Sequence, residues 1–288
     1  MIDQLSITDG HREFREEVRE FCEAEIAPIV EEHEAEGTFP EKLVPKLGSN
    51  GLVGVPYPTE YGGAGLDYRS FVIAMEEMSK TWKLVGGAVN VCSGLVGYPI
   101  HEKGEEWQRE EWLRPIFEGE AIGALGMTEP EAGSDASSIE TTARTEGDEL
   151  VVDGHKVWMT NGELADFMLV LAKTDEGPSL IGIPEPWGRE GVELVRNIAC
   201  MEGEASIESE VTFDRVRVPA DNVVGTPGKG LRYVLEGLDI GRMGTAAQGV
   251  GVAQAAMEAS VEFAGEREQF GQPIREFQGI GFKLADMR

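Results

Sequence analysis

The chain is best understood from one stretch, Gly126-Met-Thr-Glu-Pro-Glu-Ala-Gly-Ser-Asp135, and from Trp158-Met-Thr160 in the next strand-like segment. Glycine in the first stretch allows the backbone to approach a ligand closely, because it has no Cβ. Thr128 and Ser134 add hydroxyls that donate or accept hydrogen bonds. Trp158 offers a flat apolar face. Thr160, two residues later, points to the same side of the strand as Trp158. These features favour a flavin site, with Trp158 packed on the ring and Thr160 bonded to its edge.

Helical patterns flank this region on both sides. From Ser6 to about Gly119 apolar residues recur three and four positions apart, and Thr8 can cap the first helix. After Pro227-Gly-Lys-Gly230 the helical period returns. It predicts one segment over 231–238, a long amphipathic one over 243–264 and a third from Gln278 onward.

Short β-branched runs occupy the middle of the chain and are separated by Gly, Pro and Asn turns. Gly147-Asp148 predicts a hairpin turn. The spacing predicts a small antiparallel barrel or sandwich. We therefore expect an α+β multidomain protein, with an N-terminal helical domain over 1–121, a middle β domain with the flavin motifs over 122–225 and a C-terminal helical domain over 226–288.

The last expected helix runs to Leu284-Ala-Asp-Met-Arg288 without a Gly, Asn or Pro to end it. Two long helices cannot bury their apolar stripes alone. The expectation is an incomplete bundle, which a continuation of the chain, a second polypeptide or self-association would complete.

With these residues in place, the chain resembles an acyl-CoA dehydrogenase, and the short-chain, butyryl type most. Several spaced motifs match in the right order, which makes the resemblance far stronger than any one of them alone. They are Met127-Thr-Glu129, Ala132-Gly-Ser-Asp135, Ser138, Trp158-x-Thr160, Val216-Arg-Val-Pro219, Asp239-Ile-Gly-Arg242, Arg267, Phe270-Gly271 and Gln278.

The resemblance implies a site for FAD. The residues that it assigns to this cofactor are Leu125, Met127, Thr128, Gly133, Ser134, Trp158, Thr160, Arg267 and Gln278. Arg267 and Gln278 would contact the FAD of a neighbouring subunit, since guanidinium suits a bidentate phosphate contact. Ser134, Asp239 and Arg242 would bind the acyl-CoA substrate. Without the resemblance, Arg267 is a surface partner of Glu266 or Glu268, and Arg242 a charge at a helix start.

The resemblance implies removal of a proton from Cα of an acyl-CoA thioester, hydride transfer from Cβ to flavin N5, and electron delivery to an electron-transfer flavoprotein. The usual catalytic glutamate lies in a Tyr-Glu-Gly-Thr-like segment, which these residues lack. A second branch places it one residue before the CoA-contacting arginine, where this chain has Gly241. We therefore assign no catalytic residue and expect the chain alone to be nearly inactive, because a positioned base commonly gives ~10²–10⁴-fold. A further departure is Glu204, where relatives commonly carry Arg.

The 53 acidic and 25 basic side chains give a formal net charge of −28. Phosphate contact needs clustered Lys and Arg, so this composition excludes a general nucleic-acid binder, and it argues against anionic membranes. The excess is spread along the whole chain, as in halophilic proteins. It predicts a fold that loosens in low salt.

Three cysteines, Cys22, Cys92 and Cys200, lie far apart, and the four histidines are scattered, so we expect no metal site. Reduced thiols and a start without an apolar leader indicate a cytoplasmic protein. No stretch is long and apolar enough to span a bilayer.

Three alternatives stay open at this point. The fold could serve an acyl-CoA oxidase or a flavin monooxygenase, although Asp239-Ile-Gly-Arg242 favours a CoA-bound substrate. The chain could also be a non-catalytic FAD- or CoA-binding fragment, or one subunit of a split enzyme. For the acyl-CoA dehydrogenase that the resemblance implies, we expect either a homo-oligomer, dimer or tetramer, or a second chain that supplies the remaining helices.

Overall fold

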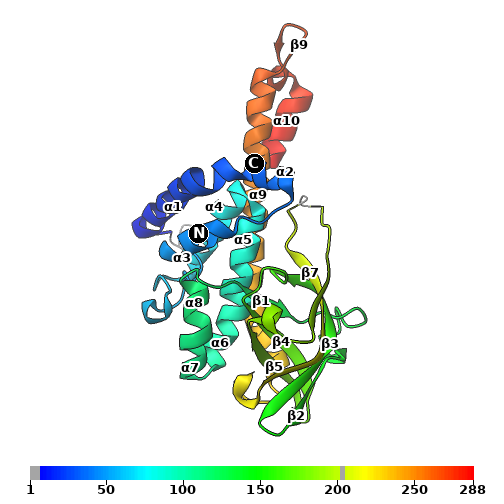
Figure 1. Cartoon of the computed structure of the whole chain (residues 1–288). Coiled ribbons are helices and arrows are strands. Elements are labelled where there is room, and N and C mark those ends of the chain that lie inside the picture. The colour runs from blue at the N-terminus through cyan, green and yellow to red at the C-terminus, as the bar shows by residue number, and fades with distance from the viewer. Residues whose placement is uncertain (1–6, 202–204) are drawn as a thin grey trace.

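The computed structural model describes residues 7–201 and 205–288. Figure 1 shows the helices of the first 120 residues gathered on one side and the sheet on the other. A long helix, α9, runs behind both and extends beyond them to a tip at β9. The fold thus has a helical N-terminal domain, a β-sheet middle domain and a helical C-terminal region. Glu204 lies outside the described residues.

The first helix begins where the sequence predicts. Thr8 caps α1 (Asp9–Phe21) by accepting a hydrogen bond from the N–H of His11. Further α-helices follow, and a π-helical segment joins α5 to α6. They are α2 (Val30–Glu36), α3 (Val44–Ser49), α4 (Tyr68–Thr81), α5 (Lys83–Asn90), a π-helical segment (Val91–Gly97), α6 (Tyr98–Lys103), α7 (Glu106–Gln108) and α8 (Arg114–Phe117).

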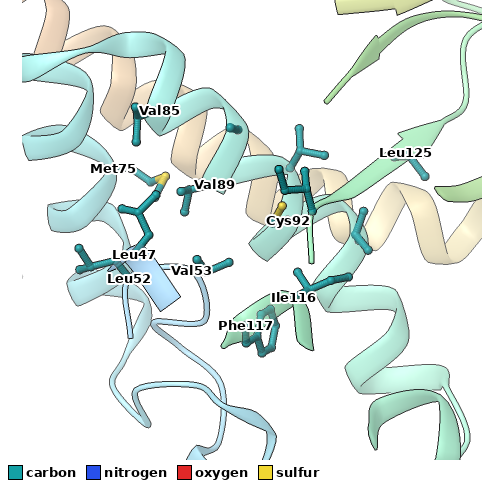
Figure 2. Close-up of a cluster of buried hydrophobic side chains, with 14 of the residues drawn as sticks. Leu47, Leu52, Val53, Met75, Val85, Val89, Cys92, Ile116, Phe117 and Leu125 are labelled. Carbon is teal, nitrogen blue, oxygen red and sulfur yellow. The ribbon is translucent and has the colours of Figure 1, made fainter. Parts of the chain in front are cut away.

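A hydrophobic core joins these helices to the start of the sheet. Figure 2 shows side chains from α3, α4 and α5 around Val89 and Cys92, and Leu125 on the strand β1 (Gly123–Gly126) at the edge of the same cluster. Its neighbour Ala124 packs in the separate core of the sheet. Successive strand residues point to opposite faces, so this strand is clamped between the two cores.

The sheet has eight strands, in the order β6-β7-β3-β2-β4-β5-β8, with β1 paired to β4. The other strands are β2 (Thr142–Glu146), β3 (Glu149–Thr160), β4 (Phe167–Thr174), β5 (Gly177–Pro184), β6 (Val192–Asn197), β7 (Glu208–Pro219) and β8 (Val223–Val224). The predicted hairpin is confirmed, since Glu146 pairs with Glu149 across Gly147, whose φ is +68°.

The expected antiparallel barrel or sandwich is wrong in two respects. Among the described residues the end strands β6 and β8 do not pair with each other, so the sheet is not closed. In addition, β1 pairs with β4 in parallel, from Gly123–Phe167 to Gly126–Val170. The parallel pairing is possible because a long connection, which includes the hairpin β2–β3, joins these two strands.

The C-terminal region differs from expectation as well. One continuous helix, α9 (Gly230–Glu266), replaces the two predicted segments. Gly237 and Gly241, close to the expected break, are buried where α9 packs against the N-terminal helices. Close packing thus outweighs the ~1 kcal/mol that each glycine costs a helix. The short strands β9 (Glu268–Gln269) and β10 (Gln272–Pro273) then lead to α10 (Gln278–Met287). Within the described ranges, no helix has the length and apolar character needed to cross a membrane.

Candidate cofactor site

A bulge near the end of β3 directs Trp158 out of the sheet. The register against β7 shifts between Lys156 and Met159, and Trp158 has a φ of +57°. Lys156 and Met159 are both fully buried, although regular alternation would place them on opposite faces. Trp158 is 57% exposed. Bulges commonly re-aim one side chain in this way.

Trp158 and Thr160 face the same open cavity, of about 1020 Å³. The sequence prediction that these two side chains share one side is therefore confirmed, although the bulge rather than simple alternation produces it. Residues of α5, of the segment that follows β6, of β7 and of α9 form the rest of the cavity wall. The remaining lining residues are Lys83, Ala199, Cys200, Met201, Glu208, Thr245, Gln248, Gly249 and Val252.

The loop after β1 lies directly beside the bulge. The carbonyl oxygen of Thr128 accepts a hydrogen bond from the N–H of Val157 at 2.9 Å. Met127 and Thr128 are half-buried, whereas Gly133 and Ser134 are exposed farther along the loop. A Cβ on Gly133 would meet only the Thr128 methyl, at 4.0 Å, so the backbone there is open to an approaching ligand.

A buried ion pair, which the sequence analysis did not identify, fastens this loop. Lys156 Nζ donates to Glu129 Oε1 at 2.7 Å and to the Met127 carbonyl at 3.1 Å. The N–H groups of Glu140 and Thr141 also donate to the Glu129 carboxylate. Glu129 thus ties both ends of the loop to the bulged strand.

Charge is balanced within this pair. Burial pushes the pKa of Glu129 upward, but the donors from Glu140, Lys156 and Thr141 outweigh it and hold the pKa below its usual range. Burial lowers the pKa of Lys156 to about 8, against the opposing effect of Glu129. Both groups are therefore charged at neutral pH.

A second glutamate that the sequence analysis missed lines the cavity itself. Glu208 pairs with Thr160 across β3 and β7, and the Thr160 hydroxyl donates to Glu208 Oε1 at 2.7 Å. Burial raises the pKa of Glu208, against the opposing effects of Thr160 and of the charge on Lys83. Its position, 48 residues from Thr160 in sequence, left no local signal for this pairing.

The other predicted site residues lie at different distances from the cavity. Asp239 and Arg242 are exposed on α9 and form an ion pair with each other. Arg242 is seven residues before Gly249, two helical turns along the same face. Leu125 is buried in the core shared with the N-terminal helices.

Arg267 and Gln278 are not brought to this cavity. Both are exposed at the projecting end of α9 and the start of α10 (Figure 1). Arg267 is 15 residues beyond Val252, the last lining residue, which is roughly 22 Å along a helix. The chain therefore separates the predicted residues into a group at the cavity and a group at the tip.

Gly241, the position where one branch carries its base, is buried against the π-helical segment. A Cβ there would lie 2.8 Å from Leu95 Cδ2. A larger side chain at this position would require Leu95 to move.

Among the described residues, no group of three or more His, Cys, Asp or Glu side chains could hold a metal ion.

The arrangement suits a planar, partly polar ring. An exposed tryptophan face supplies apolar contact, a neighbouring hydroxyl supplies a hydrogen bond, and the open Gly133 backbone leaves space for a polar extension. Such sites combine apolar walls with a few placed polar groups.

Models of one family match nearly the whole chain. They are described as acyl-CoA dehydrogenase N-terminal domain, middle domain and C-terminal domain, over residues 8–120, 124–216 and 228–288.

Individual relatives agree with this. A probable acyl-CoA dehydrogenase, YngJ, from Bacillus subtilis is 41% identical over 98% of this chain and 76% of its own length. A short-chain specific acyl-CoA dehydrogenase from Clostridium acetobutylicum is 38% identical over the same shares of the two chains.

Two solved structures extend the comparison. Butyryl-CoA dehydrogenase from Megasphaera elsdenii superposes with a TM-score of 0.92 at 36% identity, covering 98% of this chain and 76% of that one. A glutaryl-CoA dehydrogenase from Mycobacterium smegmatis in complex with FADH2 gives 0.91 at 31% identity, covering 97% and 72%. The chain therefore belongs to the acyl-CoA dehydrogenase family, with short-chain and butyryl-type members among its relatives.

Proposed function

We propose that this chain binds FAD and acts in the 2,3-dehydrogenation of an acyl-CoA thioester. The observation that carries the proposal is the bulge that exposes Trp158 beside Thr160 at an open cavity, next to the loop fastened by Glu129. Bound FAD would take up the hydride that leaves the β-carbon, while a base takes the α-proton and a carbon–carbon double bond forms.

The residues of the chain would bind and orient in this scheme. Trp158 would support one face of the ring, and Thr160 would hydrogen-bond its edge. Met127 and Thr128 would line the ring, with Gly133 and Ser134 admitting the polar parts of cofactor and substrate. Leu125, buried behind them, would hold β1 in place.

Substrate and partner contacts follow from the exposed groups. Asp239 and Arg242 would contact the CoA portion of a short acyl-CoA, since Arg242 lies on the α9 face that continues into the cavity wall. Arg267 and Gln278, remote from the cavity of their own chain, would reach the FAD of a second copy in a homo-oligomer. Electrons would pass on to an electron-transfer flavoprotein in fatty acid metabolism.

A second candidate is a chain that binds FAD or CoA without turning over. It is supported by Gly241, which offers no base and lies against Leu95. An oxidase or monooxygenase of the same fold would differ in how fast dioxygen reoxidises the reduced ring.

The test is the visible absorption spectrum of the chain after loading with FAD and desalting in high salt, before and after butyryl-CoA is added. We expect a bound flavin spectrum that is lost in Trp158→Ala, because the ring then loses its wall. Bleaching by butyryl-CoA would support dehydrogenation, whereas a bound but unbleached flavin would support the second candidate. Failure to retain flavin at any salt concentration would contradict dehydrogenation and the FAD-binding form of the second candidate, and would leave only a chain that binds CoA.

We also propose that the net charge of −28 serves solvation in high salt. Screening should relieve self-repulsion. A melting temperature unchanged between low and molar KCl would contradict this.

A further inference from the structure

Glu208 occupies an unusual position for an acidic side chain. It begins β7, lines the cavity beside Trp158 and accepts a hydrogen bond from the Thr160 hydroxyl, with 2.7 Å between the two oxygens. The charged or titratable side chains that share the described wall are Lys83 from α5 and Cys200 from the segment after β6. Those that α9 contributes to the wall, Thr245, Gln248, Gly249 and Val252, carry no charge.

The hydroxyl of Thr160 has a single proton to donate. A carboxylate can only accept hydrogen bonds, so ionised Glu208 engages the single hydroxyl hydrogen of Thr160. The Thr160 oxygen can then only accept a hydrogen bond from a ligand. A protonated Glu208 can donate to Thr160 instead, which releases the threonine proton toward the cavity. The ionisation of Glu208 therefore selects whether Thr160 is a donor or an acceptor.

This selection matters for the cofactor of the proposed function, on which the inference rests. An edge nitrogen of a flavin accepts hydrogen bonds when the ring is oxidised and carries a hydrogen when the ring is reduced. An accepting Thr160 thus matches the reduced ring, and a donating Thr160 matches the oxidised ring.

We propose that Glu208 is a positioning residue that sets the direction of the Thr160 hydrogen bond and thereby shifts the redox equilibrium of the bound flavin with pH. Ionised Glu208 favours the reduced ring through Thr160. A hydrogen bond that matches one redox state of the ring changes the ratio of reduced to oxidised flavin about tenfold. For a two-electron couple this shifts the midpoint potential by about 30 mV.

A direct effect of the Glu208 charge would have the opposite sign. A negative charge close to the ring disfavours the electron-rich reduced form, so charge alone would make ionisation favour oxidised flavin. The two mechanisms are therefore separable by the sign of the pH effect and by whether it needs the threonine hydroxyl.

The experiment measures the midpoint potential of the FAD-loaded chain between pH 4 and pH 9. In the wild type we expect an added shift of about 30 mV toward the reduced form as Glu208 ionises. Glu208→Gln and Thr160→Val should each abolish that shift. Glu163→Gln is the matched control, because Glu163 is exposed on the turn just after Thr160 and is outside the cavity wall. It should keep the shift.

A flat profile in the wild type, or a shift of opposite sign that persists in Thr160→Val, would overturn the proposal. A readout without cofactor tests the contact itself: carboxyl NMR titration of the FAD-free chain. Thr160→Val should move the Glu208 titration to higher pH, and Thr160→Ser should restore it. An unmoved titration would also overturn the proposal. Failure to bind FAD would instead count against the proposed function, and the NMR result would still decide whether Thr160 and Glu208 are coupled.

Discussion

Two glutamates lie on either side of the bulge in β3 and differ in what surrounds them. Glu129 is 6% exposed and receives hydrogen bonds from Lys156 and from two backbone N–H groups. Glu208 accepts one hydrogen bond, from the Thr160 hydroxyl, and the charge on Lys83 also acts to lower its pKa. The pKa of Glu129 is held below its usual range and that of Glu208 is raised. Burial acts to raise the pKa of both carboxyl groups, so the larger set of donors around Glu129 accounts for the opposite directions of the two shifts.

This contrast separates a structural role from a functional one. A carboxylate with a full set of donors and a cationic partner holds a loop in place. A carboxylate with fewer donors, placed at a cavity, can change its charge or redirect a neighbouring proton. Substitutions that remove each charge while keeping its shape should therefore act differently.

The largest effect should come from Glu129→Gln. It removes the anionic partner of fully buried Lys156, and breaking a buried pair commonly costs about 3–5 kcal/mol. Urea unfolding should show this loss at pH 7. Glu131→Gln, at an exposed position of the same loop, should change stability by less than about 0.5 kcal/mol. A Glu129→Gln loss as small as that of the control would show that the pair does not fasten the loop.

A smaller effect should come from Gly126→Ala. A Cβ at this position would lie 2.6 Å from Met159 Cε and 3.2 Å from Lys156 Cγ, so the end of the fully buried Met159 side chain must move. Overpacking of this kind costs about 1–3 kcal/mol. Gly133→Ala is the matched control, since open space surrounds it, and its melting temperature should stay near that of the wild type. Equal melting temperatures for the two variants would argue against tight packing behind Trp158.

The smallest effect should come from Glu208→Gln, with the opposite sign to Glu129→Gln. Because the folded pKa of Glu208 is raised above the usual 4.5, the folded state holds this proton to higher pH than the unfolded state. The free energy of unfolding therefore falls as the pH rises from the unfolded pKa through the raised folded pKa of Glu208, and stays lower above it. Glu208→Gln should stabilise the chain at pH 7, by on the order of 1 kcal/mol or less.

That gain should disappear near pH 3, where Glu208 is protonated in both states. For Glu129, whose folded pKa is lowered, the stabilisation is present above 4.5 and is lost as the pH falls. Thermal unfolding of both variants between pH 3 and pH 7 checks the pair of signs. A stabilising Glu129→Gln, or a destabilising Glu208→Gln, at pH 7 would remove the distinction between the two glutamates.

The sequence predicts much of the fold because its strongest signals are local. Helical spacing, the Thr8 cap and the Gly147 turn each act within a few residues. The missed features depend on contacts across long sequence separations. The strand β1 is short and apolar, so its pattern carries no pairing direction, and a buried glycine face on α9 looks like a helix break until its packing partner is known.

The site shows the same division. Trp158 and Thr160 were identified because their residue types and spacing suit a flat ring. Glu129 stood within a matched motif, and Lys156 within the same strand as Trp158, yet only the fold shows that they meet. The strand β3 also contains Glu149, Asp153 and His155, so Lys156 does not stand out in the sequence as a side chain that needs a buried partner.

The glycine face of α9 has a consequence for how this chain can change over time. A Cβ on Gly244 would lie 2.0 Å from Asn90 Oδ1, and one on Gly251 would lie 2.2 Å from the Glu76 carbonyl oxygen. An enlarged residue at Gly244 becomes acceptable only after Asn90 has first become smaller. At Gly251 the obstacle is main chain, which no substitution on α4 removes. Descendants of this sequence should therefore vary freely on the exposed side of α9 and follow a fixed order of changes, or none, along its glycines.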